Sequence, residues 1–166
     1  NYESAKLHRK GVEKVLRDQA ARGQVLIMKK KDAEARFGNR LVYACLGAVP
    51  KGELDEDQDM IVRVVHDGTN GIVVNYAIVV RDASVFPAAS DLKRILRELG
   101  FLKGPAFGTT GDVTEAHRAV PVAECDWPLL ACQVEPDGDV FINKCGTYGI
   151  SSAAYWWGRL VAALCR

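Results

Sequence analysis

Apolar residues recur at helical spacing in four segments of the chain. Over residues 4–21 they repeat every three to four positions among charged residues, as an amphipathic helix requires. Residues 90–99 carry a leucine and isoleucine stripe that starts at a capping serine and ends before Gly100. Residues 31–37 predict a short helix, and the stripe from residue 151 onward predicts a final one.

Strand-like segments occupy the intervals between these helices. Residues 41–49 and 60–66 are rich in apolar and β-branched residues, and residues 72–80 share that composition. Residues 129–144 hold two apolar runs around a Pro-Asp-Gly turn and predict a hairpin. The apolar run at residues 25–28 is too short to classify. Because helices and strands mix without regular β-α-β alternation, the sequence predicts an α+β fold with an antiparallel sheet and packed helices.

Length and composition are those of one globular domain. The chain has 166 residues, of which 48% are hydrophobic, and a formal net charge of +1. It has no apolar run of bilayer length and no signal peptide, so we expect an intracellular protein of the cytoplasm or nucleus with no membrane partner. The missing initial Met and the helical pattern that runs into the last residues predict a segment of a longer polypeptide.

Charge distribution and cysteine content bear on possible binding partners and on metal or disulfide sites. Residues 1–40 hold eleven Lys and Arg against five Asp and Glu, whereas the rest of the chain is acidic. The basic region could contact a phosphate backbone, or it could be a solvated helix face. The five cysteines include no Cys-x-x-Cys pair, which favours reduced thiols over a zinc site or a disulfide framework.

Two short runs carry candidate chemistry. In the run 111–122, Asp112 stands at the end of a predicted strand and before a short helical pattern. A carboxylate held there could bind a divalent metal ion, and it could equally cap the helix that follows. In the run 146–157, a glycine turn leads to serines that can begin the final helix. Each run alone therefore also has a purely structural explanation.

The first run resembles motif A of reverse transcriptases. Asp112 stands where that family has a metal-binding aspartate, with Ala116 at the family's alanine and an apolar-Pro-apolar tail at residues 120–122. The resemblance implies that Asp112 is the catalytic metal ligand and that the backbone carbonyl of Val113 also reaches metal. His117 stands where many members have a Phe or Tyr that excludes the ribose 2′-hydroxyl. The resemblance implies a nucleotide contact for His117 and leaves sugar discrimination open; a hydrogen-bonded surface histidine is the alternative.

The second run resembles motif B of retrotransposon enzymes. Residues 148–154 read Tyr-Gly-Ile-Ser-Ser-Ala-Ala, against Phe-Gly-Leu-Ser-Ser-Ala-Pro in the family. The resemblance implies that Tyr148 and Gly149 lie at the nucleotide, where glycine lets the backbone approach template or substrate. A capped helix after a glycine turn is the alternative explanation of the same residues.

Two upstream positions resemble the fingers of the same enzymes. Arg63 and Asp67 fit the family's Arg-x-x-x-Asp element, and Asn75 fits the asparagine that ends it, with extra residues between. The resemblance implies that Arg63 binds the triphosphate, as its planar guanidinium is suited to do. Lys51, which follows Pro50, resembles a phosphate-neutralising lysine of the preceding motif. Both could instead be ordinary surface residues.

The resemblance implies a fingers-like region at residues 1–106 and a partial palm at residues 107–166. The implied function is RNA-directed DNA synthesis by a retrotransposon-type reverse transcriptase, a nucleotidyltransferase. Its partners would be an RNA or DNA template-primer and deoxynucleoside triphosphates, and its cofactor Mg²⁺ or Mn²⁺. The chain holds nothing like the Tyr-x-Asp-Asp turn of motif C. The remaining carboxylates would therefore come from the rest of the parent polypeptide, and we expect this segment alone to be inactive.

Two other classes of protein fit the same residues. A degenerate polymerase-like domain could bind nucleic acid or another partner without catalysis, since His117 and Ala154 depart from the family pattern. An unrelated α+β domain with chance matches would place Asp112 far from Arg63 and Gly149. The order and spacing of the matches favour the polymerase.

Overall fold

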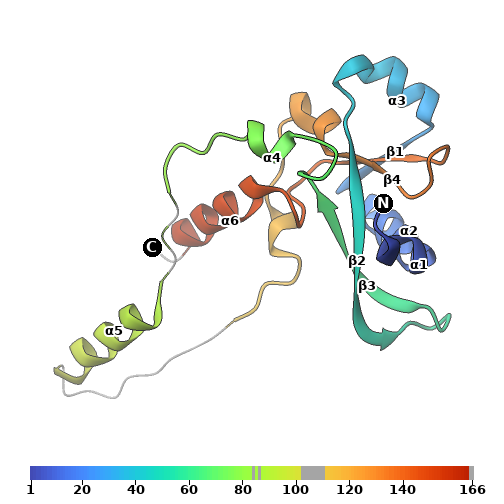
Figure 1. The fold of residues 1–166 in the computed structure, drawn as a ribbon. Coiled ribbons are helices and arrows are strands. Elements are labelled where there is room, and N and C mark those ends of the chain that lie inside the picture. Colours follow the sequence, from blue (N-terminus) through green and yellow to red (C-terminus); the bar gives the residue numbers. More distant parts are fainter. Residues whose placement is uncertain (84, 86, 102–110, 165–166) are drawn as a thin grey trace.

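A five-stranded mixed sheet forms the centre of the protein (Figure 1). The computed structural model describes residues 1–83, 85, 87–101 and 111–164. The strand order is β1-β5-β4-β2-β3. The strands are β1 Val25–Met28, β2 Tyr43–Leu54, β3 Met60–Asp67, β4 Ala131–Gln133 and β5 Val140–Asn143. The α+β prediction is confirmed.

Six α-helices and three 3-10 helices surround or extend from the sheet in the described part of the chain. The α-helices are α1 Glu3–Leu7, α2 Arg9–Ala21, α3 Lys30–Phe37, α4 Val74–Ala77, α5 Ala89–Phe101 and α6 Ser151–Leu164. The 3-10 helices are η1 Gly38–Arg40, η2 Ala116–Ala119 and η3 Glu124–Leu130. None of the helices in the described ranges is both long enough and apolar enough to cross a bilayer.

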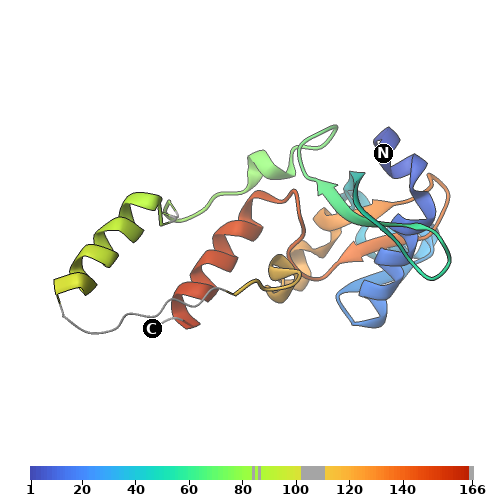
Figure 2. The same cartoon turned by 90° about the horizontal axis from the view of Figure 1, so that it is seen from below.

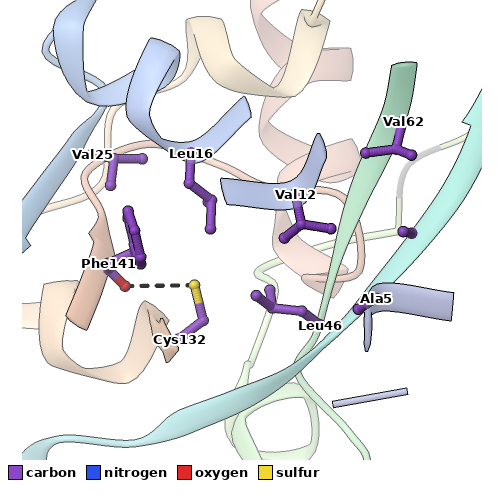
Figure 3. Packing of buried hydrophobic residues seen from close by; sticks show 9 residues of the cluster. Ala5, Val12, Leu16, Val25, Leu46, Val62, Cys132 and Phe141 are labelled. Carbon is purple, nitrogen blue, oxygen red and sulfur yellow. Dashed lines mark hydrogen bonds between the residues drawn. The ribbon is translucent and has the colours of Figure 1, made fainter. Parts of the chain in front are cut away.

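The main core lies between α2 and one face of the sheet. Val12 and Leu16 of α2 are 0% and 2% exposed and pack with Leu46 of β2 and Phe141 of β5 (Figure 3). Burying a side chain of this size stabilises the fold by roughly 1.5–3 kcal/mol. Gly11 lets α2 approach this closely, because a Cβ there would stand 2.7 Å from the carbonyl oxygen of Met60 in β3.

A second core cluster lies on the opposite face of the sheet. Successive side chains of a strand point to opposite faces. In β5, Phe141 accordingly packs in the α2 cluster, whereas Val140 and Ile142 pack with Ala33 of α3. Both faces of β5 are therefore covered, and all four of its residues are buried.

Helices α5 and α6 lie largely outside these two clusters. Figures 1 and 2 show α5 set well apart from the sheet, with α6 leading away from the sheet in the same general direction. The predicted leucine stripe of α5 is exposed at Leu92, Ile95 and Leu96. In α6 only part of the apolar stripe is buried: Tyr155 is 6% exposed, whereas Trp156 is 48% exposed.

Four structural predictions need correction. The helix predicted over residues 4–21 is interrupted at His8, between α1 and α2. The sheet is not wholly antiparallel, because β2 and β4 run parallel. The hairpin begins only at Ala131, since the preceding residues form η3 with Pro128 inside it. Residues 72–80 contain no strand: Val74–Ala77 forms the short helix α4, where tertiary contacts override strand composition.

The predicted boundary between residues 106 and 107 falls outside the described residues. On either side of it, strands of the two predicted parts share one sheet. β5 pairs with β1, and β4 pairs with β2. The fingers-like and palm-like segments thus contribute to a common core.

Candidate functional site

The tail of the motif A run and the segment that leads into motif B lie side by side. Pro121 and Cys145 form an antiparallel bridge. The N–H of Val122 donates to the carbonyl of Lys144 at 2.9 Å, and the N–H of Gly146 donates to that of Val120 at 2.9 Å. Two runs recognised separately in the sequence are therefore joined by backbone hydrogen bonds.

Tyr148 lies at the meeting point of three segments. Its ring centroid is 4.9 Å from that of His117, which belongs to the motif A run. The guanidinium carbon of Arg63, in β3, lies 5.3 Å from the same ring, within the range of a cation–π contact. The structure thus brings Arg63, His117 and Tyr148 together, and we call these three residues the Tyr148 cluster.

Gly149 is required by its backbone conformation and by its surroundings. Its φ is +102°, a region that side chains with a Cβ rarely adopt. A Cβ would also collide with the carbonyl oxygen of His66, the residue whose N–H donates to the carbonyl of Tyr148 at 2.8 Å. This glycine permits close approach to the end of β3, which is a structural reason for it independent of any nucleotide.

Asn75 ties the upstream segment to the start of α6. Its Oδ1 accepts the N–H of Ser151 at 2.9 Å, which caps the first residue of that helix. Its Nδ2 donates to the carbonyl of Gly149 at 2.8 Å and to Oγ1 of Thr69 at 2.9 Å. The asparagine matched to the fingers element therefore contacts the motif B turn directly.

Beneath the Tyr148 cluster lies a buried polar network that the sequence analysis missed. Arg118 is 6% exposed, and its Nη1 donates to Oδ1 of Asn143 at 2.7 Å while its Nη2 donates to Oε1 of Gln19 at 2.9 Å. His66 is 3% exposed, and Asn143 Nδ2 lies 3.5 Å from its Nδ1. The period-two spacing of Val62, Val64 and His66 in β3 is the signal that could have placed His66 inside.

Burial sets the protonation of both histidines in the region. Desolvation, aided by the positive charge of Arg118 and opposed by Asp67, lowers the pKa of His66 to about 4. Desolvation also lowers the pKa of His117, which is half-buried. Both imidazoles are therefore neutral at pH 7. His117 meets the Tyr148 ring as a planar neutral group.

Asp112 and Val113 lie at the surface, before η2. Asp112 makes no hydrogen bond or ion pair with the described residues, and Val113 is 53% exposed. Glu115 adopts a left-handed conformation with φ of 53°, and its carbonyl accepts the N–H of Arg118 at 2.7 Å, so the helical pattern there is a single 3-10 turn. The strand predicted before Asp112 falls on residues outside the described ranges.

The described residues do not assemble a complete metal site. Across residues 1–83, 85, 87–101 and 111–164, no group of three or more His, Cys, Asp or Glu is placed to hold a metal ion. Asp112 offers a hard oxygen ligand suited to Mg²⁺ or Mn²⁺, but a pair of such ions needs further carboxylates. The described residues therefore supply only part of the donor set that a two-ion centre needs, and no reaction step is derived through it.

Lys51 lies in β2, two residues beyond Val49. Arg63 pairs with Val49, and the register is irregular between Pro50 and Leu54. Gly52, with φ of +79°, lies in this irregular part next to Lys51, which is exposed. Of the predicted nucleotide-contacting residues, the structure gathers Arg63, His117, Tyr148 and Gly149. No hydrogen bond, ion pair or cation–π contact joins Lys51 to these four residues.

Many charges of the basic region are compensated by acidic side chains. Ion pairs join Arg9 to Glu135, Lys14 to Asp55, Arg17 and Lys29 to Asp139, Arg22 to Glu115, Lys30 to Asp137 and Arg36 to Glu124. Pairs this exposed contribute little to stability, with a typical value of about 0–1 kcal/mol. They do lower the surplus positive charge that residues 1–40 would present to a phosphate backbone.

The four cysteines in the described part of the chain are all free thiols, as predicted. Cys132 is fully buried, and its thiol donates to the carbonyl of Phe141 (Figure 3). Burial raises the pKa of Cys132 to about 12. Cys132 and Cys145, which are both buried, belong to the packing of the fold.

Comparison with known proteins identifies no relative. No protein-family model, no curated protein and no solved structure matches the chain. The structure establishes an α+β protein with a five-stranded mixed sheet and a cluster of arginine, tyrosine and histidine at the junction of three segments.

Proposed function

We propose that this chain carries the fingers and the first part of the palm of a retrotransposon-type, RNA-directed DNA polymerase. The observation that supports the proposal most directly is the Tyr148 cluster. Arg63, His117 and Tyr148 each resemble a residue of a different motif of that family, and Arg63 and His117 both contact Tyr148 in the fold. A chance set of sequence matches gives no reason for these three positions to meet.

The Tyr148 cluster has the chemistry to hold a nucleoside triphosphate. Arg63 is exposed and lies over the Tyr148 ring, and it makes no ion pair with the described residues. A guanidinium stacked on an aromatic face keeps the N–H groups at its edge available for two parallel hydrogen bonds to phosphate oxygens. Neutral His117 beside Tyr148 supplies a flat surface for the sugar or the base. In this proposal Arg63 binds phosphate, and His117 with Tyr148 shapes the pocket for the nucleoside.

Asp112 would contribute one carboxylate to the metal ions of the polymerase, and the carbonyl of Val113 could assist it. Metal ions in such enzymes neutralise the phosphates and activate the primer hydroxyl. Since the described residues contain no group of three or more metal-binding side chains, nucleotide binding is a sharper test of this chain than turnover.

The test is a titration of the full chain with deoxythymidine triphosphate, followed by calorimetry or by amide chemical shifts. We expect Arg63→Ala to weaken binding by about 10-fold or more, because two charge-assisted hydrogen bonds are lost. Arg63→Lys should recover only part of the affinity, since it keeps the charge and loses the planar fork. Arg94→Ala is the matched control, because Arg94 is exposed on α5 and pairs only with Glu98 among the described residues.

Equal affinity of the wild-type protein and Arg63→Ala would contradict the proposal, as would the absence of any triphosphate binding by the wild type. If the protein bound a template-primer duplex in a salt-dependent way and no triphosphate, the result would instead support the non-catalytic nucleic-acid-binding module. Titration with uridine triphosphate, in the wild type and in His117→Phe, would show whether residue 117 excludes the 2′-hydroxyl.

A further inference from the structure

A small polar cavity lies beneath the Tyr148 cluster, between α2, the β2–β3 hairpin and β5. Its volume is about 20 Å³. Leu16, Leu46 and Cys132 form an apolar wall, and Figure 3 shows these side chains converging from α2, β2 and β4. Arg118, His66 and Thr147 contribute polar groups to the lining. A space of this size holds about one water-sized species.

Three buried polar atoms of the lining residues have no hydrogen-bond partner among the residues that the structure describes. They are Nε of Arg118, Nε2 of His66 and Oγ1 of Thr147. Their residues are 6%, 3% and 5% exposed, so bulk water does not satisfy them. Because buried polar groups without partners destabilise a fold, three of them around one cavity indicate an occupant.

The hydrogen-bond network shows that these atoms can all act as donors. Oδ1 of Asn143 accepts from Arg118, so Nδ2 of Asn143 is a donor, and it donates to the carbonyl of Leu130 at 3.1 Å. The same Nδ2 faces Nδ1 of His66 at 3.5 Å, which makes Nδ1 the acceptor of the ring. In the neutral imidazole the proton is then on Nε2. Arg118 Nε carries a proton always, and Thr147 can rotate its hydroxyl to donate.

The cavity also carries an uncompensated positive charge. The hydrogen-bond acceptors of Arg118 are the neutral oxygens of Gln19, Asn143 and Gly146. Glu115 is near enough for its charge to act on Arg118, but its carboxylate pairs with Arg22. A buried cation without a counter-charge is costly, and an anion in the cavity would remove that cost.

We propose that this cavity binds a monatomic anion, chloride under cellular conditions, held by Nε–H of Arg118, Nε2–H of His66 and the hydroxyl of Thr147. Phosphate and carboxylates are too large for a cavity of about 20 Å³. A water molecule fits the volume, but it must donate as well as accept, and donors dominate here. The anion joins the segments that bear the Tyr148 cluster, since His66, Arg118 and Thr147 are near neighbours in sequence of Arg63, His117 and Tyr148. The proposal does not depend on polymerase activity.

The experiment measures thermal unfolding of the full chain in sodium chloride, sodium bromide and sodium gluconate at equal ionic strength. We expect chloride and bromide to raise the Tm by about 2–4 °C over gluconate at a saturating concentration. Thr147→Val removes one donor with little change of shape, and it should raise the half-saturating halide concentration by about 10-fold or more. Thr114→Val, at an exposed position, is the matched control and should leave the halide effect unchanged.

Crystals grown in bromide give a second and independent readout. The proposal requires an anomalous peak within hydrogen-bond distance of Arg118 and His66. Equal Tm values in halide and gluconate, together with density for water at that position, would overturn it. A bromide peak without any halide effect on the Tm would show an adventitious ion only, and this too would overturn it.

Discussion

The backbone carbonyl of His66 occupies the space in which a Cβ on Gly149 would stand. This contact joins the end of β3 to the turn before α6, and the N–H of His66 strengthens it by donating to Tyr148. The position of the Tyr148 ring over Arg63 depends on it, because Tyr148 and Gly149 are consecutive. The turn is therefore held by β3 as much as by its own sequence.

The first prediction concerns Gly149→Ala. We expect this change to lower the free energy of unfolding by roughly 3 kcal/mol, since it combines an unfavourable φ of +102° with a clash against backbone. Urea unfolding followed by circular dichroism measures it. Gly23→Ala is the control, because Gly23 has a φ of +76° with no atom near its Cβ position, and it should cost only about 1 kcal/mol. Equal losses in the two variants would show that the clash is relieved.

The second prediction concerns the cap that Asn75 provides to α6. Asn75→Ala should lower the free energy of unfolding by about 1–2 kcal/mol, since the N–H of Ser151 and the carbonyl of Gly149 both lose a partner. The stability of Asn75→Asp should lie between those of Asn75→Ala and the wild type. Aspartate keeps the acceptor for the N–H of Ser151 and loses the donor to the carbonyl of Gly149. Urea unfolding tests the order of the three proteins. If Asn75→Asp were as unstable as Asn75→Ala, the hydrogen bond to Ser151 would not be the main contribution of Asn75 to stability.

The third prediction is a loss of stability on acidification that is due to His66. Its pKa is about 4 in the folded protein, against about 6.5 when unfolded, so the unfolded chain binds the proton more readily. Stability should fall as the pH decreases from about 6.5 to 4, by roughly 3 kcal/mol for this residue, and the loss should level off below pH 4.

Unfolding free energies of the wild type and His66→Gln across this range isolate that contribution. The lowered pKa of His117 acts in the same direction in both proteins and cancels in the difference. Identical pH dependence in the two proteins would mean that His66 is not held neutral by burial.

The fourth prediction concerns the reactivity of cysteine. Cys125 is exposed, whereas Cys132 is buried with a pKa raised to about 12, so only the first should react readily at pH 8. Iodoacetamide labelling read by peptide mass spectrometry should modify Cys125 and leave Cys132 unmodified until urea unfolds the protein. Rapid labelling of Cys132 under native conditions would contradict the packing of the core around it.

The sequence predicted those elements whose pattern is local. The stripe of α2, the hairpin turn at Pro136-Asp137-Gly138 and the helix α5 each carry their signal within a few residues, and the structure contains all three. The strand prediction for residues 72–80 was wrong. β-Branched composition is typical of a half-buried sheet surface, whereas here Asn75 ties the segment to the motif B turn by hydrogen bonds. Strand β1 has only four residues, so its assignment depends on pairing with β5.

The candidate site likewise contains residues that the sequence indicated and residues that only the structure shows. The motif matches led us to expect Asp112 near Arg63 and Gly149. The structure joins Arg63 and His117 through Tyr148. Among the described residues, Asp112 makes no hydrogen bond or ion pair with Arg63 or Gly149. The roles assigned to these residues and to Asp112 remain predictions. The burial of His66 could have been predicted from the alternation along β3. That of Arg118 could not, because it results from contacts with Gln19 and Asn143, which lie far away in the chain.

The strand order has a consequence for how the protein forms during synthesis. β1 and β2 are not neighbours, because β5 and β4 lie between them. A nascent chain that has reached only β3 therefore lacks the middle of its sheet, and the apolar face of α2 has no complete surface to cover. Pairs as distant in sequence as Val25 and Asn143 must close before the core exists, a topology typical of slow folding. Until then the β2–β3 hairpin presents an open edge, and pairing with another chain at that edge would compete with folding.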